Sequence, residues 1–170
     1  MKKRIVFVLA VILVFASCEI IPTENFFYEA KITAVIDGDT VEIQFIENPP
    51  VDCKWNERVR LIGVDTPELF KNPPEYFAQE AKNYTNEYYL ANVLFEFDTV
   101  SAKRDKYDRL LGFVYVDGVY VDGSLYSLNE QLIEKGMGYY YGVFSFDRDK
   151  MIDFAAAEKR AKAQKKGLWQ

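Results

Sequence analysis

The chain contains no histidine among its 170 residues. This absence excludes the Ser-His-Asp triad, zinc sites built on histidine ligands, and any histidine general base. Proton transfer in this protein must therefore use a carboxylate, a tyrosine, a lysine or a bound water molecule.

Basic residues are also scarce, because 21 Lys and Arg stand against 26 Asp and Glu and the formal net charge is −5. Residues 1–17 hold three basic residues and no acidic one, so the remainder of the chain carries a net charge of −8. Such a balance argues against a generic nucleic-acid-binding surface. A local basic cleft that also holds cations on acidic ligands could still bind a phosphodiester.

A long apolar run is missing as well. The run from Ile5 to Ala16 has 12 residues, whereas about 20 are needed to span a bilayer. Because it follows Lys2-Lys3-Arg4, it predicts a secretory signal in residues 1–17. The end of the run, Val14-Phe15-Ala16-Ser17-Cys18, resembles a bacterial lipoprotein cleavage site. The resemblance implies an exported protein of the bacterial cell envelope, anchored to a membrane by a lipid on Cys18, with residues 18–26 as its tether.

Only two cysteines are present, Cys18 and Cys53. Ordinary signal cleavage would leave Cys18 free to form a disulfide with Cys53, as an exported chain permits. Lipidation of Cys18 is the preferred interpretation, and it would leave Cys53 an unpaired and chemically inert thiol.

The composition fits one folded domain, expected over residues 27–170. Apolar residues make up 49% of the chain and aromatic residues 16%, which is enough for a sizeable core. Apolar alternation and β-branched content predict five strands, with a short sixth segment at 119–121 pairing with the fifth. The five strands are expected at 26–36, 40–46, 57–64, 92–100 and 109–116.

Apolar spacing of three and four residues predicts three helices, at 75–91, 124–135 and 147–166. Asp147 is expected to cap the third helix, and Gly136 and Gly167 to follow the second and third. The aromatic stretch 137–146 is expected to be extended. Five strands with a helix between the third and fourth predict an α+β, mainly β fold: a closed barrel of the OB type with about three helices.

Polar side chains gather in three clusters around these strands. The central one is the run Arg60-Leu61-Ile62-Gly63-Val64-Asp65-Thr66-Pro67-Glu68, flanked by Asp37-Gly38-Asp39-Thr40 and Asp105-Lys106-Tyr107-Asp108-Arg109. Asp39 and Asp65 follow neighbouring strands and could converge on a hard divalent cation, which prefers oxygen ligands. Taken singly, Asp39 is better explained as a hairpin-turn residue and Asp65 as a capping or turn residue before proline.

Three further side chains complete the candidate site. Arg60 and Arg109 can each donate paired hydrogen bonds to a phosphate, and Glu68 can orient or deprotonate a water molecule. The plainer alternatives are an ion pair of Arg60 with Glu57 or Glu42, a pair of Arg109 with Asp105 or Asp108, and an exposed loop carboxylate at Glu68.

With these clusters the chain resembles the staphylococcal-type thermonuclease (micrococcal nuclease) family. The matching stretches are Val35-Ile36-Asp37-Gly38-Asp39-Thr40-Val41, the run from Arg60 to Glu68, Gln79-Glu80-Ala81 and Asp105-Lys106-Tyr107-Asp108-Arg109. The resemblance implies an OB-fold barrel and a Ca²⁺-dependent endonuclease that hydrolyses DNA and RNA and leaves 3′-phosphate ends.

The resemblance also implies roles for individual residues. The side chains of Asp39 and Asp65 and the carbonyl of Thr66 would be Ca²⁺ ligands. Glu68 would act on the attacking water, while Arg60 and Arg109 would hold the scissile phosphate. Lys106 and Tyr107 are expected to line the substrate groove, although a solvated loop would explain them nearly as well.

Two features depart from the family pattern. Asp108 stands where the family usually has glycine, and it could pair with Arg109 or repel the substrate phosphate. The register is lost near Gly142, so Tyr139, Tyr140 and Tyr141 receive no substrate role.

Two rival interpretations stay open. The chain could be a catalytically weak OB-fold binding lipoprotein of the envelope, or a barrel that binds an oligosaccharide or a protein. In each case a monomer is expected.

Overall fold

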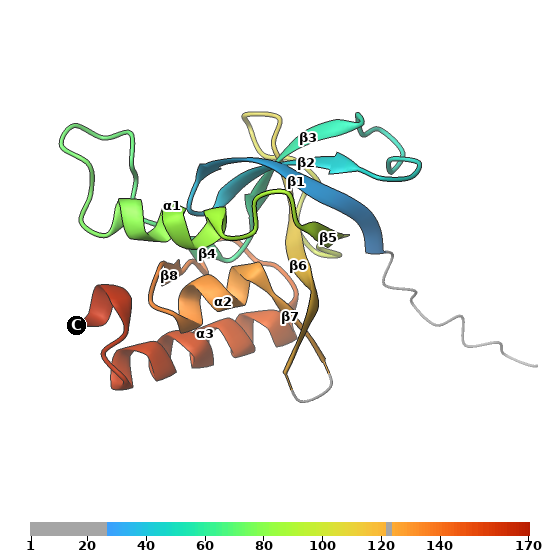
Figure 1. Cartoon of the computed structure of the whole chain (residues 1–170). Helices are drawn as coiled ribbons and strands as arrows, with labels where there is room; N and C mark the ends of the chain where they lie inside the picture. The colour runs from blue at the N-terminus through green and yellow to red at the C-terminus, as the bar shows by residue number, and fades with distance from the viewer. Residues whose placement is uncertain (1–26, 122–123) are drawn as a thin grey trace, which may run out of the picture.

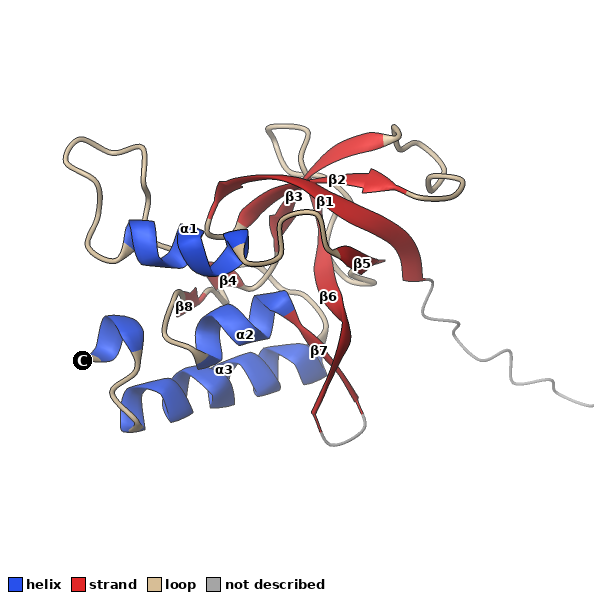
Figure 2. Cartoon of the chain, in the orientation of Figure 1, coloured by secondary structure: helices blue, strands red, loops and turns tan. Residues whose placement is uncertain are grey.

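The computed structural model describes residues 27–121 and 124–170, and in it the strands curl together above a layer of helices (Figures 1 and 2). One sheet has the strand order β3-β2-β1-β5-β6-β7, and an additional parallel pairing of β3 with β6 closes five strands into a barrel. The five are β1 (Phe27–Asp37), β2 (Thr40–Phe45), β3 (Asn56–Leu61), β5 (Asn92–Phe97) and β6 (Leu110–Val121). The predicted barrel of the OB type is therefore confirmed.

Alternation of apolar and polar residues explains these strands. In β2, Val41, Ile43 and Phe45 are buried while Gln44 is exposed. Each strand thus turns one face inward, as the two-residue period of side chains requires. The core that results is continuous with the inner faces of the helices.

Three helices pack on the barrel: α1 (Ala78–Asn86), α2 (Leu128–Glu134) and α3 (Arg148–Ala163). α2 contacts both β6 and α3, and α1 contacts β1, so the helices cover one side of the barrel (Figure 2). The side chain of Asp147 accepts a hydrogen bond from the Lys150 amide, which confirms the predicted cap of α3. Gly136 follows α2 with a φ of 70°, the left-handed conformation expected after a helix end.

The predicted strand 57–64 is broken in the structure. β3 ends at Leu61, and the chain turns at Ile62-Gly63 before β4 (Val64–Asp65), which pairs with β8 (Tyr139–Tyr140). Gly63 has a φ of +77°, and a Cβ there would lie 2.6 Å from the Phe146 ring. Because glycine has no side chain, the core rings can pack against this turn. The turn also places Asp65 on a separate strand.

Several helix boundaries were also predicted wrongly. Residues 124–127 form β7 (Ser124–Ser127), a partner of β6, and Ser127 caps a shorter α2 by accepting a hydrogen bond from Glu130. The helix expected over 75–91 is limited to 78–86, because Phe77 has a φ of 70° before it. Apolar periodicity alone did not distinguish these capping and turn conformations from helix.

The C-terminal third differs in two further places. Of the aromatic stretch 137–146, only Tyr139–Tyr140 is a strand. α3 ends at Ala163, and Gly167 begins a short 3₁₀ helix, η1 (Gly167–Trp169), instead of closing α3.

The predicted signal peptide, tether and Cys18 lie outside the described residues. None of the helices in the described ranges is long and apolar enough to cross a membrane. Cys53 is half-buried and forms no disulfide within the described part of the chain. Burial and the nearby Glu57 raise the pKa of its thiol, which agrees with an inert residue.

Candidate active site

The three polar clusters meet at one end of the barrel. The β1–β2 turn carries Asp39, and Thr40 at the start of β2 pairs with Arg60 near the end of β3. β4 then brings Asp65 and the following Thr66 to the same place. The strand ends therefore assemble residues that lie 27 positions apart in the sequence, as shown by the hydrogen bond from Thr66 to Asp39.

Asp39 is buried and is held by hydrogen bonds to both oxygens. Its Oδ1 accepts from the Thr40 hydroxyl at 3.0 Å, and its Oδ2 accepts from the Thr66 amide at 2.8 Å and the Thr66 hydroxyl at 3.0 Å. Nη1 of Arg60 lies 3.1 Å from the same Oδ2. Asp39 is thus more than a hairpin-turn residue, because it joins three segments of the site.

Arg60 links the two predicted metal-binding carboxylates. Its Nη1 donates to the carbonyl of Val64 at 2.7 Å, and its Nη2 donates to Oδ1 of Asp65 at 2.8 Å. The alternative partners of Arg60 bind elsewhere, since Glu57 pairs with Arg104 and Glu42 with Arg58. One guanidinium therefore contacts both Asp39 and Asp65.

Burial and the neighbouring charged residues shift the pKa of Asp65. Burial raises the pKa of its carboxyl; Arg60 lowers it, and the nearby Asp39 raises it further. Two carboxylates this close favour a bound cation. Among the described residues, however, no group of three or more Asp, Glu, His or Cys side chains is arranged as a metal site.

The donor set nevertheless fits a hard cation in part. Asp39 and Asp65 contact the same guanidinium, and the backbone of Thr66 lies against Asp39. The predicted ligand atoms, which are carboxylate oxygens of Asp39 and Asp65 and the carbonyl oxygen of Thr66, are of the kind that calcium prefers, and calcium takes about six to eight of them. A Ca²⁺ at this position would need water or substrate oxygens to complete its ligands.

Glu68 lies just beyond these residues and is mostly exposed. Partial burial raises the pKa of its carboxyl, and Asp37, Asp39 and Asp65 raise it further. Its backbone is held by Glu75, whose Oε2 accepts the Glu68 amide at 2.8 Å and whose amide donates to the Glu68 carbonyl at 3.1 Å.

Arg109 approaches the same end from the loop before β6. Its Nε donates to Oδ2 of Asp105 at 2.7 Å, and its Nη1 lies 3.4 Å from the Thr40 hydroxyl. Burial would raise the pKa of Asp105, but hydrogen bonds from Arg109 outweigh it and lower the pKa below its usual value. The predicted alternative of an Arg109–Asp105 pair is correct, yet it leaves the guanidinium facing the site.

Asp108 does not pair with Arg109. Its carboxylate lies 3.6 Å from Arg104 and 3.8 Å from Lys54. Its φ of 65° is a conformation that favours glycine and that aspartate tolerates. This explains how aspartate can stand at a position where the family resemblance predicts glycine.

A groove of about 550 Å³ joins the two arginines. The predicted substrate residues Lys106 and Tyr107 line it, and the Arg109 guanidinium lies 5.4 Å from the centre of the Tyr107 ring. Tyr141 and Phe144 also line it. The groove thus combines basic groups with aromatic rings, a pairing suited to phosphates and bases.

Sequence reasoning gave no role to four contributors, Asp37, Glu75, Phe144 and Tyr141, the last of which lines the groove. Asp37 is 7% exposed beside Asp39, and burial and then Asp39 are among the causes that raise its pKa. Glu75 and Phe144 lie in segments without a recognisable motif. Only Asp37 had a signal, its place in the Asp-Gly-Asp turn.

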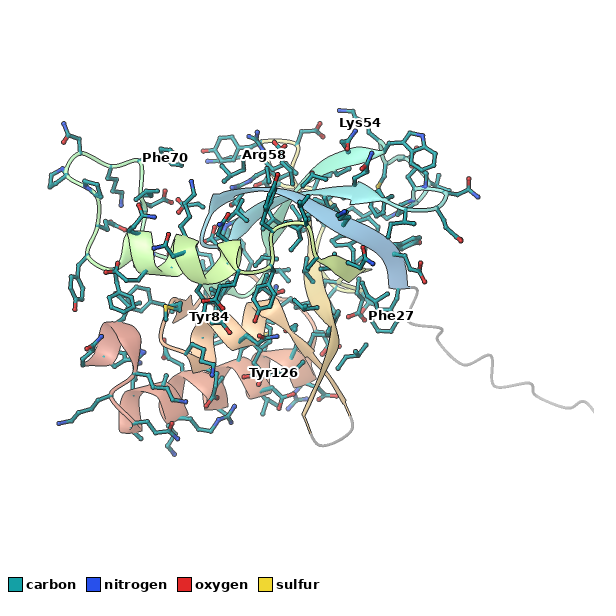
Figure 3. The ribbon with its side chains drawn as sticks, in the orientation of Figure 1. Phe27, Lys54, Arg58, Phe70, Tyr84 and Tyr126 are labelled. Carbon is teal, nitrogen blue, oxygen red and sulfur yellow. The ribbon has the colours of Figure 1, made fainter. Side chains whose placement is uncertain are left out.

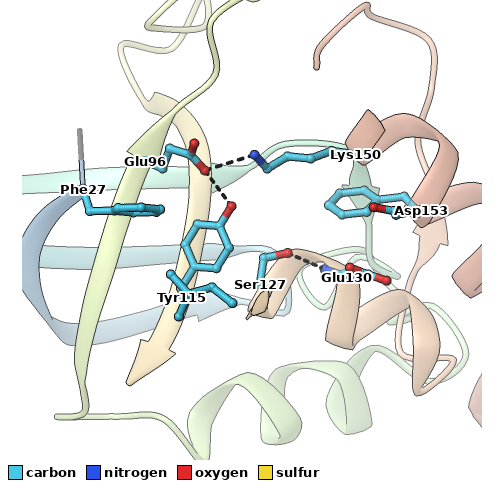
Figure 4. Close-up of a pocket in the computed structure, with 9 residues that line it drawn as sticks. Phe27, Glu96, Tyr115, Ser127, Glu130, Lys150 and Asp153 are labelled. Carbon is cyan, nitrogen blue, oxygen red and sulfur yellow. Dashed lines mark hydrogen bonds and ion pairs between the residues drawn. The ribbon is translucent and has the colours of Figure 1, made fainter. Parts of the chain in front are cut away.

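A second cavity, of about 330 Å³, lies away from this groove (Figure 4). Its buried Glu96 accepts a hydrogen bond from the Tyr115 hydroxyl at 2.6 Å and lies 3.1 Å from Nζ of Lys150. Because these charges satisfy one another, this cavity is a less suitable site for phosphate chemistry than the groove.

Comparisons with known proteins agree with this geometry. The sequence model described as "Staphylococcal nuclease homologue" matches residues 58–170. An uncharacterized protein of Methanocaldococcus jannaschii is 30% identical over 161 residues, covering 84% of this chain and 72% of that protein. The thermonuclease of Staphylococcus intermedius is 31% identical over 142 residues, covering 82% of this chain and 74% of the thermonuclease.

Other relatives are longer than this chain. The prophage-derived endonuclease YokF of Bacillus subtilis is 30% identical over 144 residues, and the match covers 83% of this chain but only 44% of YokF. The fold, the clustered site and the match over most of its length establish that the chain belongs to the staphylococcal nuclease homologue family.

Proposed function

We propose that the protein is a Ca²⁺-dependent endonuclease that hydrolyses phosphodiester bonds of DNA and RNA and leaves 3′-phosphate ends. The observation that carries this proposal is the arrangement around one groove. Arg60 there contacts both Asp39 and Asp65, while Arg109 approaches from another loop. Thermonuclease and endonuclease relatives in the same family support the nuclease activity.

The metal would be held by Asp39, Asp65 and the carbonyl of Thr66. When bound, Ca²⁺ supplies electrostatic stabilisation of the charge that develops on the phosphate oxygens. The contact of both carboxylates with the one Arg60 guanidinium supports this placement, because neighbouring negative charges favour a bound cation.

The remaining steps fall to the chain's own residues. Glu68 accepts a proton from the attacking water or positions it. Arg60 and Arg109 bind the phosphate and stabilise its growing negative charge. Water attacks phosphorus in line and the 5′ P–O bond breaks. The 5′ oxygen leaves as a hydroxyl after taking a proton from solvent, and the 3′ oxygen keeps the phosphate.

The groove beyond the phosphate would hold the neighbouring nucleotides. Lys106 lies against the Tyr107 ring, with 4.9 Å between its Nζ and the ring centre. The pair offers a cation for the backbone and an aromatic face for a base.

We also propose that the protein is exported to the cell envelope and anchored there by a lipid on Cys18. The basic residues before an apolar run of 12, and the motif that ends in Cys18, support this proposal.

Hydrolysis of single-stranded DNA by the chain from Glu19 onward tests the activity. Cleavage should require Ca²⁺, stop with chelator and fall by about 10²–10⁴-fold in Glu68→Ala. The matched control is Glu47→Ala, an exposed carboxylate in the β2–β3 loop, which should cleave normally. Folded protein that does not cleave in Ca²⁺ would leave the binding-barrel alternative, and cleavage that survives chelator and mutation would exclude this site.

A further inference from the structure

The loop between β2 and β3, residues 46–55, exposes large apolar side chains. Val51 is 80% exposed, Trp55 53% and Ile46 48%. Exposed apolar patches commonly mark sites of interaction with proteins or membranes. The nuclease chemistry proposed above makes no use of them.

Hydrogen bonds fix the backbone of this loop, although its apolar side chains are exposed. The Cys53 amide donates to the Pro50 carbonyl at 3.0 Å, and the Lys54 amide donates to Oε1 of Glu57 at 2.7 Å. From a distant segment, Nη2 of Arg104 donates to the Asp52 carbonyl at 3.1 Å. The backbone is therefore fixed while the apolar side chains project, as in a preformed binding surface.

The same loop lies at the end of the barrel where the N-terminal segment enters. The amide of Ile46 donates to the Glu29 carbonyl at 2.9 Å, so the loop adjoins the start of β1. Figure 3 shows Lys54 and Phe27 on one side of the molecule and Phe70 on the other. β2 has six residues, which span about 20 Å in a strand, and it separates the loop from Asp39.

The proposed anchor places this end near a membrane. Eight residues separate Cys18 from Phe27, and a chain of this length reaches at most about 30 Å. Loop 46–55 thus lies within reach of the lipid head groups. Asp39 lies at the other end of β2, and the loop also contacts the segment before β6 through Arg104 and Asp108.

We propose that loop 46–55 is a membrane-contact surface, with Trp55, Val51 and Ile46 entering the interface between lipid head groups and acyl chains. Tryptophan is favoured there because its ring is apolar and its N–H remains hydrated. The loop carries Glu47 and Asp52 besides Lys54, so apolar contact and not attraction to anionic lipid drives the binding. This inference rests on the proposed lipid anchor.

The experiment uses residues 18–170 with Cys18→Ser, which keeps the whole described structure and lacks both the lipid and the apolar signal run. Vesicles of phosphatidylcholine, and of phosphatidylcholine with an equal part of phosphatidylglycerol, are mixed with the protein in a Trp169→Phe background. We expect co-flotation with both vesicles and a blue shift of Trp55 emission. Val51→Ser should lower the partition coefficient about tenfold, the effect of about 1.4 kcal/mol.

Phe70→Ser is the matched control, because Phe70 is 71% exposed but lies at the other side of the molecule. It should leave vesicle binding unchanged, and Val51→Ser should leave DNA hydrolysis unchanged. The proposal is overturned if neither vesicle is bound, if Phe70→Ser weakens binding as much as Val51→Ser, or if binding needs phosphatidylglycerol and disappears in high salt.

Mass spectrometry of the native protein separates this inference from the anchor. A lipidated Cys18 together with no vesicle binding by the unlipidated chain overturns the surface and leaves the anchor. Vesicle binding by loop 46–55 with no lipid on native Cys18 supports the surface and overturns the anchor.

Discussion

At the scale of single residues, Glu75 holds the backbone from which Glu68 projects. Its side chain accepts the Glu68 amide at 2.8 Å, and its own amide donates to the Glu68 carbonyl at 3.1 Å. Lys71 donates to the other oxygen of the same carboxylate. Glu75 is therefore a positioning residue for the proposed general base, in a loop that otherwise carries few restraints.

Removing this carboxylate should lower the rate more than it lowers binding. We expect Glu75→Ala to reduce kcat about tenfold with little change in KM, because a displaced base is ineffective in the transition state. Glu75→Gln should recover most of the rate, since its amide oxygen can accept the same hydrogen bond. Steady-state hydrolysis of an oligonucleotide in Ca²⁺ measures both parameters.

Lys71→Ala is the control, because it removes the Lys71 contact and leaves the Glu68 contacts in place. An equal loss of kcat in Lys71→Ala, or an effect on KM alone, would contradict a positioning role for Glu75.

At the scale of elements, the α2–α3 contact contains a carboxyl group that burial disfavours in its charged form. Burial, and then Asp153 of α3, raise the pKa of Glu130 to about 6 from an ordinary 4.5, against the effect of Arg160. Nη2 of Arg160 lies 3.5 Å from Glu130 Oε1, which is too far for a strong hydrogen bond. The folded state thus holds this proton more tightly than the unfolded state does.

The sign of the pH dependence follows from this difference. Between pH 4.5 and about 6 the folded state binds more protons at Glu130, so its contribution to stability falls as the pH rises through that window. We expect Glu130→Gln to raise the free energy of unfolding by about 1–2 kcal/mol at pH 8 and by little at pH 4.5. Urea denaturation at the two pH values measures it.

Glu134→Gln serves as the matched change on the same helix. Glu134 accepts from Nε of Arg160 at 2.6 Å, so its replacement should not stabilise the protein at either pH. A Glu130→Gln protein that is less stable than the parent at pH 8 would show that the Arg160 contact outweighs burial.

A strand or helix boundary could be predicted where local burial sets it, but not where contacts with distant residues set it. Alternation located the barrel strands, because burial of one face leaves alternating apolar and polar residues in the sequence. The segment predicted at 119–121 as a partner of the fifth strand is instead the end of β6, and it pairs with β7.

Alternation could not locate the turn at Gly63, which depends on the Phe146 and Phe154 rings beneath it. Alternation also could not separate β7 from α2, because Leu125 fits both the two-residue period of a strand and the period of about 3.6 residues of a helix. The pairing of Leu125 with Tyr120 places it in a strand.

At the scale of the whole molecule, the site combines residues from four segments. Their identities were predicted from motifs and a family resemblance, and the family membership is confirmed by the comparisons. The contact of Arg60 with both aspartates and the support of Glu68 by Glu75 could not be predicted, because they depend on the path of the chain through three dimensions. The catalytic and metal-binding roles of these residues stay predictions.

The charge of the whole molecule makes one further prediction, about salt. The groove offers three cationic side chains, Arg60, Lys106 and Arg109, on a protein of net charge −5. If each of these side chains neutralises one phosphate of single-stranded DNA, the logarithm of the binding constant should fall with the logarithm of the salt concentration, with a slope of about −2. Fluorescence anisotropy with a labelled oligonucleotide and the Glu68→Ala protein measures the slope in constant Ca²⁺.

Within that measurement, Lys106→Ala should make the slope shallower by about 0.7, whereas Lys165→Ala, on the segment after α3, should leave it unchanged. Arg60 and Arg109 already contact aspartates, so the slope should not exceed the value expected for three phosphates. A slope near −5 would mean that nucleic acid binds a broader basic surface than the groove, and the substrate path proposed here would be wrong.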